Sequence, residues 1–117
     1  LNRPGKLSAA DFEVVKKHPG WGAEVGRQAN LPEEVINIIL YHHERFDGRG
    51  YPTGAKGTKI PLEARIVAVA DVFDAMSTDR PYAKGYERAE AMRVMGVLRG
   101  AALDPQLVDI FLAGLAP

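Results

Sequence analysis

The sequence predicts an all-α protein in which residues 1–117 form one domain, a helical bundle of five to six helices. Apolar residues recur at steps of three and four in several segments, which is the spacing of one helix face. No segment of useful length alternates apolar and polar residues as a strand does. Glycine and proline are concentrated between the periodic segments, above all in residues 46–61, and they mark the breaks between helices.

A capping-box pattern predicts where the first helix begins. Ser8 stands three residues before Asp11 and an apolar periodic run follows, although the usual third residue of this motif is glutamate or glutamine. We expect this helix to end near His18 and Pro19, and a second short helix to cover residues 21–28.

The next helices are separated by a long loop. A third helix is expected over residues 32–44, with Pro32 well suited to its first turn. Residues 46–61 hold too many glycines and prolines for any regular element, so they are predicted to form one loop. A fourth helix is expected over residues 62–77, because its apolar residues form a stripe at helical spacing.

Two helices complete the predicted bundle. Residues 87–99 have one apolar face, and Gly100 is expected to end that helix. Asp104 and Pro105 then form a good pair of cap and first-turn residues for the last helix, which ends near Leu115.

Charge and composition exclude several kinds of partner. Lysine plus arginine number 15 and aspartate plus glutamate number 15, so no net field attracts DNA, RNA or an acidic membrane, and any phosphate binding must be local. The longest apolar runs, of about five residues, are far short of the roughly 20 that cross a bilayer. No cysteine is present, which suits a reducing cytosol and leaves histidine, aspartate and glutamate as the available metal ligands.

Two adjacent histidines, His42 and His43, lie on the predicted third helix and border its apolar face. We expect both imidazoles to be largely buried, where each ring nitrogen needs a polar partner, and a metal ion would supply one. The alternative is that one histidine is hydrogen-bonded in the core while the other interacts with the C-terminal dipole of the helix.

Further candidate ligands occur on neighbouring helices. His18 closes the first predicted helix, and Asp71 lies in an otherwise apolar run, where an unpaired carboxylate is costly. Asp74 follows Asp71 by three residues, so both carboxylates lie on one flank of the fourth helix and can reach one site. Imidazole and carboxylate without thiolate suit iron, manganese, zinc or nickel. Two such ions could bind a phosphate and activate a bridging water.

The loop after the histidine pair and the basic residues beyond Asp74 are candidate ligand contacts. Loops of this length tend to be functional, and glycines such as Gly50 would let the backbone approach whatever lies over the metals, although an ordinary connector is the alternative. Arg80 and Lys84 follow the fourth helix closely enough to surround an anion. Solvated surface charge is the alternative for both.

The segment HHERFDGRGYP at residues 42–52 resembles the signature of HD-GYP proteins. Five further segments match in the family's order, so the resemblance covers residues 1 to about 112. They are Pro-Gly-Lys-Leu at 4–7, His-Pro at 18–19, Pro-Leu-Glu-Ala-Arg-Ile at 61–66, Ala-Asp-Val-Phe-Asp-Ala-Met at 70–76 and Asp-Arg-Pro-Tyr at 79–82.

The resemblance implies a bacterial, cytoplasmic, metal-dependent phosphodiesterase of the HD superfamily. Such an enzyme hydrolyses the second messenger cyclic di-GMP to linear pGpG and/or GMP, and holds two or three divalent ions such as iron or manganese. The implied metal ligands are His18, His42, His43 and Asp71, and the implied catalytic acids are Asp71 and Asp74. The implied substrate contacts are Arg80, Lys84, Gly50, Tyr51 and Pro52, with Lys84 replacing a basic contact that the family has at the position of Ala83.

One departure concerns the His-Asp pair for which the family is named, because it belongs upstream of residues 4–7. We therefore expect a partial domain, inactive by itself, with uncovered apolar surface that favours self-association, and with a sensory or receiver domain further upstream in the parent. The alternative function is a non-catalytic HD-GYP module that binds nucleotide or a GGDEF-domain partner through the Gly-Tyr-Pro loop. A generic phosphohydrolase without dinucleotide specificity is a third reading.

Overall fold

The computed structural model describes residues 8–79 and 84–115. Within these ranges the chain is helical and has no β-strand, which confirms the predicted all-α class. The elements in order are α1 (Ala9–Gln28), α2 (Glu33–Tyr41), the 3-10 turn η1 (Gly57–Lys59), α3 (Leu62–Ser77), α4 (Arg88–Leu98) and α5 (Pro105–Leu115). None of the helices in the described ranges has the length and apolar character needed to span a membrane.

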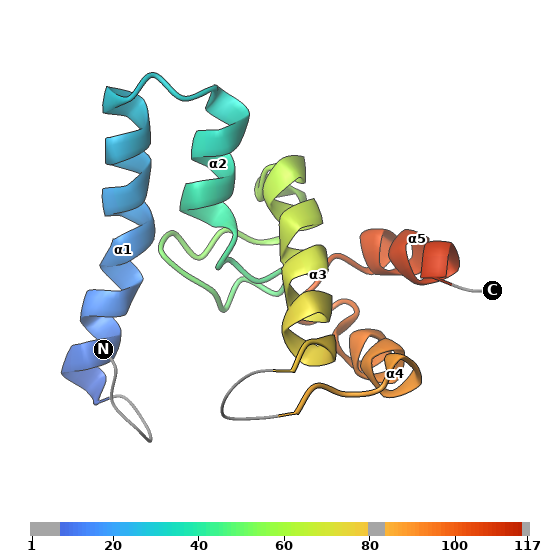
Figure 1. Ribbon diagram of the computed structural model, residues 1–117. Coiled ribbons are helices and arrows are strands. Elements are labelled where there is room, and N and C mark those ends of the chain that lie inside the picture. The colour runs from blue at the N-terminus through green and yellow to red at the C-terminus, as the bar shows by residue number, and fades with distance from the viewer. Residues whose placement is uncertain (1–7, 80–83, 116–117) are drawn as a thin grey trace.

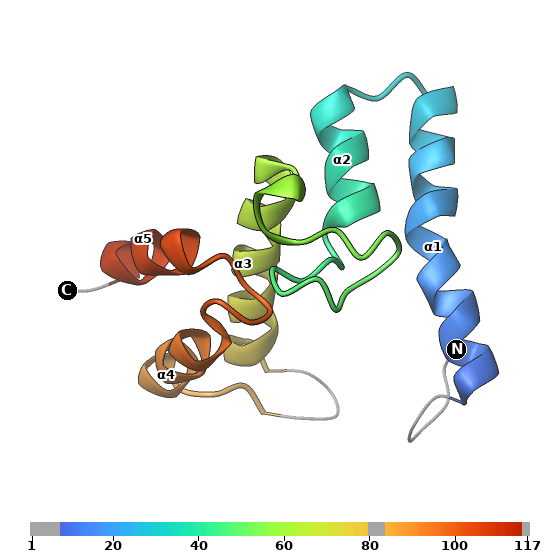
Figure 2. The same ribbon diagram turned by 180° about the vertical axis from the view of Figure 1, so that it is seen from behind.

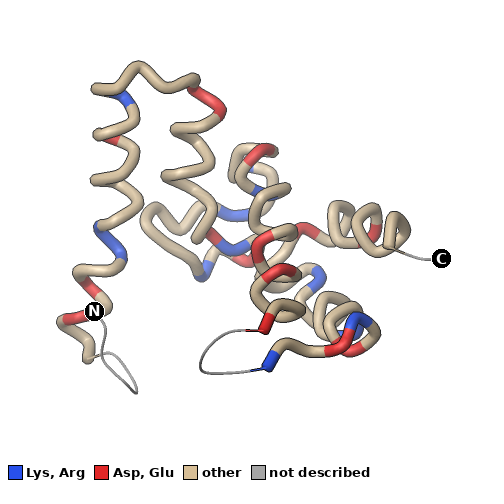
Figure 3. Tube along the Cα trace, viewed as in Figure 1, with Lys and Arg blue, Asp and Glu red and all other residues tan. Residues whose placement is uncertain are grey.

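The helices form two groups on either side of a central helix (Figures 1 and 2). Helices α1 and α2 make an antiparallel hairpin, α2 packs on α3, and α4 and α5 pack on the other side of α3 and on each other. Acidic and basic residues are interspersed along the chain, as the balanced composition predicts (Figure 3). The loop between α2 and α3 runs back from the end of α2, so it stands beside the histidine pair.

Helix α1 continues through Pro19, so the prediction of two separate helices was wrong. Proline removes one backbone hydrogen bond from a helix interior, but here it is buried, and the helix packs closely against α2 in the turns that follow it. A methyl group added at Gly22 would lie 2.9 Å from Cγ2 of Ile39, and one added at Gly26 would lie 3.4 Å from Cγ1 of Ile36. The two helices therefore approach too closely for larger side chains.

Helix α2 ends at Tyr41, three residues earlier than predicted. His42 is its C-cap residue, and His43 lies beyond the last turn. The bounds of α3, α4 and α5 agree with the prediction to within one residue, and the Ser8–Asp11 capping box is present in both directions. Local signals therefore predicted the later helices better than the first two.

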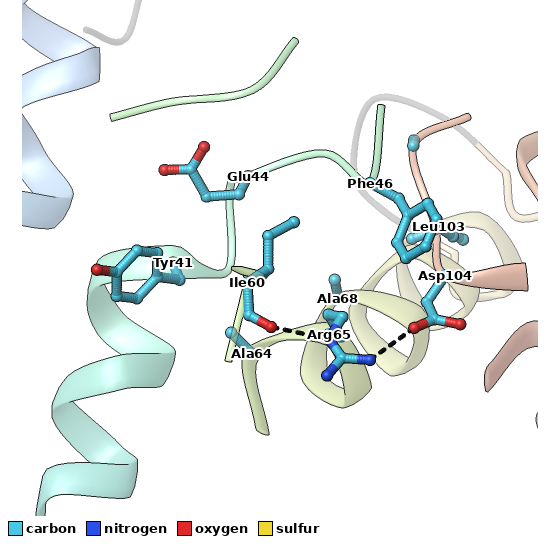
Figure 4. Close-up of a pocket in the computed structure, with 10 residues that line it drawn as sticks. Tyr41, Glu44, Phe46, Ile60, Ala64, Arg65, Ala68, Leu103 and Asp104 are labelled. Atoms are coloured by element: carbon cyan, nitrogen blue, oxygen red, sulfur yellow. Dashed lines mark hydrogen bonds and ion pairs between the residues drawn. The ribbon is translucent and has the colours of Figure 1, made fainter. Parts of the chain in front are cut away.

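The main core lies where α3, α4 and α5 meet. Its buried members are Val69, Met95, Leu103 and Val108. A buried ion pair between Arg65 of α3 and Asp104 lies at one edge of this core (Figure 4). Nε of Arg65 also donates to the carbonyl oxygen of Ile60. Because Ile60 ends the long loop, this arginine ties the loop, α3 and α5 together.

Candidate metal centre

The histidine pair occupies the C-terminal end of α2, with ring centroids 4.0 Å apart. Nδ1 of His42 lies 2.7 Å from the carbonyl oxygen of Ile38, one helical turn earlier. A carbonyl only accepts, so this nitrogen carries the proton and donates. In the neutral ring the lone pair is then on Nε2, which is the tautomer a metal ligand at that atom requires.

His43 is exposed and His42 is half-buried, so the expectation that both rings are largely buried was wrong. The reason is the early end of α2, which turns His43 out of the helix–helix contact. The ring of Tyr51 stacks on His43 at 5.1 Å with planes 15° apart. Partial burial beneath such neighbours lowers the pKa of His43, the charge of His42 lowers it further, and Asp71 raises it. A lowered pKa favours the neutral form of the His43 ring, which has a lone pair free.

Two adjacent hollows share the histidine pair as a wall. The first has a volume of about 310 Å³ and is lined by His42, His43 and Asp71, with Arg45 nearby. The second has a volume of about 260 Å³ and is lined by His42, His43, His18 and Tyr51. All four predicted metal ligands therefore border this region, with Asp71 on one side of the pair and His18 on the other.

The four predicted ligands do not meet at one point. No three histidine, aspartate or glutamate side chains within residues 8–79 and 84–115 lie close enough to hold one ion together. His18 is exposed, and its ring lies 5.3 Å from that of Trp21. The four side chains are thus of the kinds that bind metal ions, but in the described structure they are too far apart to bind one ion together. The expected convergence within a few ångströms is not found in the described part of the chain.

The two aspartates of α3 differ in their surroundings. Asp71 is exposed, so its carboxylate does not carry the cost of burial that its apolar neighbours in the sequence suggested. Asp74 is exposed too, lines neither hollow, and accepts a hydrogen bond of 3.2 Å from the hydroxyl of Thr78. Lys84 is exposed, while Arg80 lies outside the described residues.

The Gly-Tyr-Pro segment packs on the start of its own loop. A methyl group at Gly50 would lie 2.4 Å from the nitrogen of Arg45 and 2.6 Å from the carbonyl oxygen of His43. The glycine therefore permits close approach to residues 43–45, and its expected role over the metals stays a prediction. Pro52 follows Tyr51 through a cis peptide bond and borders a separate hollow beside Trp21.

The beginning of the loop is fixed by backbone bonds and by an ion pair. The amides of Phe46 and Asp47 donate to the carbonyls of Ala102 and Ala101, at 3.0 and 2.9 Å. Asp47 accepts two hydrogen bonds from Arg45, which lower the pKa of the Asp47 carboxyl to about 2. The loop therefore leaves the histidine pair along a defined path.

Sequence reasoning missed Glu44, the residue directly after the pair. Its side chain is buried, and its carboxylate accepts hydrogen bonds from the amide and hydroxyl of Thr53 and from the amide of Gly54. Its position in the sequence could have indicated this role. Glu44 follows the histidine pair and precedes a glycine-rich loop, whose many amides need hydrogen-bond acceptors.

An all-helical bundle that presents a histidine pair, an aspartate and a Gly-Tyr-Pro loop around two hollows defines the HD-GYP class of HD-domain proteins. The HD domain family matches residues 1–107, and the chain belongs to this family.

Relatives of the chain include bacterial cyclic dinucleotide phosphodiesterases. The chain is 47% identical over 118 residues to the cyclic di-GMP phosphodiesterase response regulator RpfG of Xanthomonas campestris pv. campestris, covering 99% of this chain and 31% of that protein. It is 42% identical over 114 residues to a cyclic di-GMP phosphodiesterase of Thermotoga maritima, covering 96% of this chain and 31% of that protein. The chain thus spans less than a third of either relative.

Two solved structures share the fold. A cyclic GMP-AMP specific phosphodiesterase of Vibrio cholerae, V-cGAP3, superposes with a TM-score of 0.75 at 29% identity, over 88% of this chain and 23% of that one. An HD-GYP-type protein of Bdellovibrio bacteriovorus superposes with a TM-score of 0.67 at 29% identity, over 94% of this chain and 36% of that one.

Proposed function

We propose that the chain is the part of a metal-dependent phosphodiesterase that carries the histidine pair and the Gly-Tyr-Pro loop, and that its substrate is cyclic di-GMP. The observation that carries this proposal is the placing of His42 and His43 between Asp71 and His18, in a chain 47% identical to a cyclic di-GMP phosphodiesterase. The products are linear pGpG and/or GMP.

The proposed ligands for divalent ions such as iron or manganese are His18, His42, His43 and Asp71. When bound, such ions polarise a phosphate and lower the pKa of a water molecule. The hydrogen bond from His42 to Ile38 orients one ligand in advance, as partners of metal-binding histidines do. Because the described residues do not bring three donors together, the proposal requires further groups to complete the site. The family's His-Asp pair suits this role, and no adjacent His-Asp pair occurs in the 117 residues.

The proposed substrate contacts are Arg80, Lys84, Gly50, Tyr51 and Pro52, with Asp71 and Asp74 as acids beside the site. A cyclic dinucleotide carries two phosphates, so a guanidinium that offers two parallel N–H groups suits it well. A relative specific for 3′3′-cGAMP is 34% identical to this chain. The higher identities, 47% and 42%, are with cyclic di-GMP enzymes, which favours cyclic di-GMP as substrate.

A second candidate function is a non-catalytic module that binds nucleotide or a GGDEF-domain partner through the Gly-Tyr-Pro loop. The observation that favours it is the lack of a three-donor cluster among the described residues. In that case the chain would bind a cyclic dinucleotide equally well after metal chelation. In the phosphodiesterase, removing the metal would abolish turnover.

Self-association is a further part of the proposal. Several large apolar side chains are exposed on the outer faces of α1, α4 and α5, among them Trp21 at 55%, Val25 at 67%, Val97 at 66% and Ile110 at 62%. Apolar surface of this kind is costly in water unless something covers it. We expect the mass of the 117-residue chain in sedimentation equilibrium to rise with its concentration.

The phosphodiesterase is tested on two forms of the protein, the 117-residue chain and a longer form that includes an upstream His-Asp pair. Each is incubated with manganese or iron and cyclic di-GMP, while chromatography follows the linear product and elemental analysis gives the bound metal. We expect turnover in the longer form only. In that form His43→Ala should lower metal content and turnover together, while Arg80→Ala should weaken substrate binding and leave metal content unchanged.

The results that would overturn the proposal are distinct. A metal-loaded longer form without turnover would favour the non-catalytic module. Turnover by the 117-residue chain alone at the rate of the longer form would show that no further groups are needed.

A further inference from the structure

Glu44 is buried at 5% exposure, and its carboxylate is held by the loop that follows it. Oε2 accepts from the amide of Thr53 at 2.7 Å and from its hydroxyl at 2.8 Å, and Oε1 accepts from the amide of Gly54 at 2.9 Å. Figure 4 shows this carboxylate turned away from Arg65 and Asp104. No lysine or arginine in the described ranges pairs with it, so amide and hydroxyl dipoles hold its charge.

These three hydrogen bonds close residues 44–54 into a compact ring beside the histidine pair. Inside the ring Gly50 packs so closely that an added methyl group would lie 2.6 Å from Cα of Glu44. The amide of Tyr51 donates to the carbonyl of His43 at 3.4 Å. The closed ring leaves Tyr51 directly against His43, with the two rings stacked at 5.1 Å.

Tyr51 also has support from the opposite side. The ring of Phe12 on α1 meets it edge-on at 5.7 Å, so the tyrosine lies between α1 and the imidazole of His43. His43 lines both hollows, and the plane of its ring determines the direction of the lone pair that it presents there. Whatever fixes Tyr51 therefore limits how His43 can turn.

We propose that Glu44 is a positioning residue for His43. By binding Thr53 and Gly54 it holds the Tyr51 ring against one face of the imidazole, and so sets the direction in which His43 meets the hollow that it shares with Asp71. The inference rests on the proposed function only in taking His43 as a site residue. The arrangement itself requires neither metal nor substrate.

A carboxylate is specifically suited to this task. Three hydrogens point at its two oxygens, which only accept. Glutamine has nearly the same shape but presents an NH₂ group to at least one of those donors. Losing the hydrogen bonds to the charged carboxylate leaves one or more of these donors without its partner in the ring. Glu44→Gln should therefore open the ring without removing bulk.

The test uses NMR on the 117-residue chain, in the wild type, Glu44→Gln and the matched control Glu34→Gln, which changes an exposed glutamate of α2. Hydrogen exchange at the amides of Thr53 and Gly54 should become roughly ten- to a hundredfold faster in Glu44→Gln. The imidazole proton shifts of His43 should move toward those of Tyr51→Leu, in which the stacked ring is absent. Glu34→Gln should leave both readouts as in the wild type.

The outcomes separate positioning from simple loop stabilisation. Faster amide exchange with unchanged His43 shifts would show that Glu44 fixes the loop alone, and the proposal would be wrong. Unchanged exchange would also overturn it. If Glu44→Gln fails to fold by circular dichroism, Thr53→Val replaces it. This variant removes the hydroxyl bond to Glu44 and the bond that the hydroxyl accepts from the amide of Ala55, and it keeps the amide bond of Thr53 to Glu44. A smaller shift of His43 in the same direction is expected, and no shift would count against the proposal.

A failure of the proposed function would look different from a failure of this inference. Absence of cyclic di-GMP turnover in every form of the protein would leave the shifts of His43 and the exchange of Thr53 and Gly54 unaffected.

Discussion

Nη1 of Arg65 lies 2.7 Å from Oδ2 of Asp104, and both side chains are largely shielded from water. The other oxygen of Asp104 accepts from the amides of Gln106 and Leu107, so the aspartate pairs with α3 and caps α5 at once. Removing one member of a buried pair leaves the other charge uncompensated.

The first prediction follows from that pair. Asp104→Ala should lower the free energy of unfolding by about 3–5 kcal/mol, measured by urea denaturation, because Arg65 would be left buried without its partner. The matched control is Asp109→Ala, which removes an exposed pair with Arg99 and should have little measurable effect. Equal losses in the two variants would show that burial does not distinguish these pairs.

The second prediction concerns Gly50. Gly50→Ala should destabilise the chain by about 1–3 kcal/mol, because the new methyl group would meet the backbone of residues 43–45, which cannot turn aside as a side chain can. Gly96→Ala is the matched control. Gly96 lies in α4 with nothing within 4 Å of an added methyl group, so alanine there should stabilise the helix by about 0.5–1 kcal/mol. Thermal unfolding of both variants checks the signs, and a stabilised Gly50→Ala would contradict the packing described here.

The third prediction concerns acid and the Arg45–Asp47 pair. The pKa of Asp47 falls from 3.8 to about 2 because Arg45 hydrogen-bonds the charged carboxylate. Its pKa is thus lower in the folded chain than in the unfolded one, so the pair stabilises the fold fully above pH 3.8, and this contribution is lost as the pH falls through about 2. Carbon NMR of the Asp47 carboxyl should show the titration. In Arg45→Met the pKa should return toward 3.8, and no change in that variant would exclude Arg45 as the cause.

The fourth prediction concerns metal binding by the 117-residue chain. Because His42 and His43 are neighbours and Asp71 borders the same hollow, a dilute titration with Mn²⁺ should broaden the NMR signals of these three residues first. The signals of Asp109, an exposed carboxylate on α5, should broaden only at higher concentration. Binding should be weak, since fewer than three donors in the described part of the chain lie close enough to share one ion. Simultaneous broadening at Asp71 and Asp109 would mean that surface charge alone attracts the ion.

Features that depend on nearby residues were predictable from the sequence. The Ser8–Asp11 capping box and the Asp104 cap of α5 are contacts over two or three residues, and both are present. The bounds of α3, α4 and α5 follow from apolar spacing and from the glycines and prolines between them. The HD-GYP resemblance of residues 42–52 agrees with the family match over residues 1–107.

Features that depend on what covers a residue could not be predicted in this way. Helix α1 passes through Pro19 because Gly22 and Gly26 allow α2 to pack against it, and that contact joins residues far apart in the sequence. The exposure of Asp71 has the same origin, since an apolar run is buried only where another element lies over it.

By itself, the sequence determined the helical class, the bounds of the later helices and the family, because spacing, capping and motif are properties of the chain alone. Only the tertiary structure decided where α2 ends, which way Glu44 turns and how His43 is held. From the sequence alone, Glu44 could either continue the helix or bind the loop, and in the fold it lies beyond α2 and binds Thr53 and Gly54. The second conformation is possible only because the folded loop brings amides without other partners within reach of the buried carboxylate.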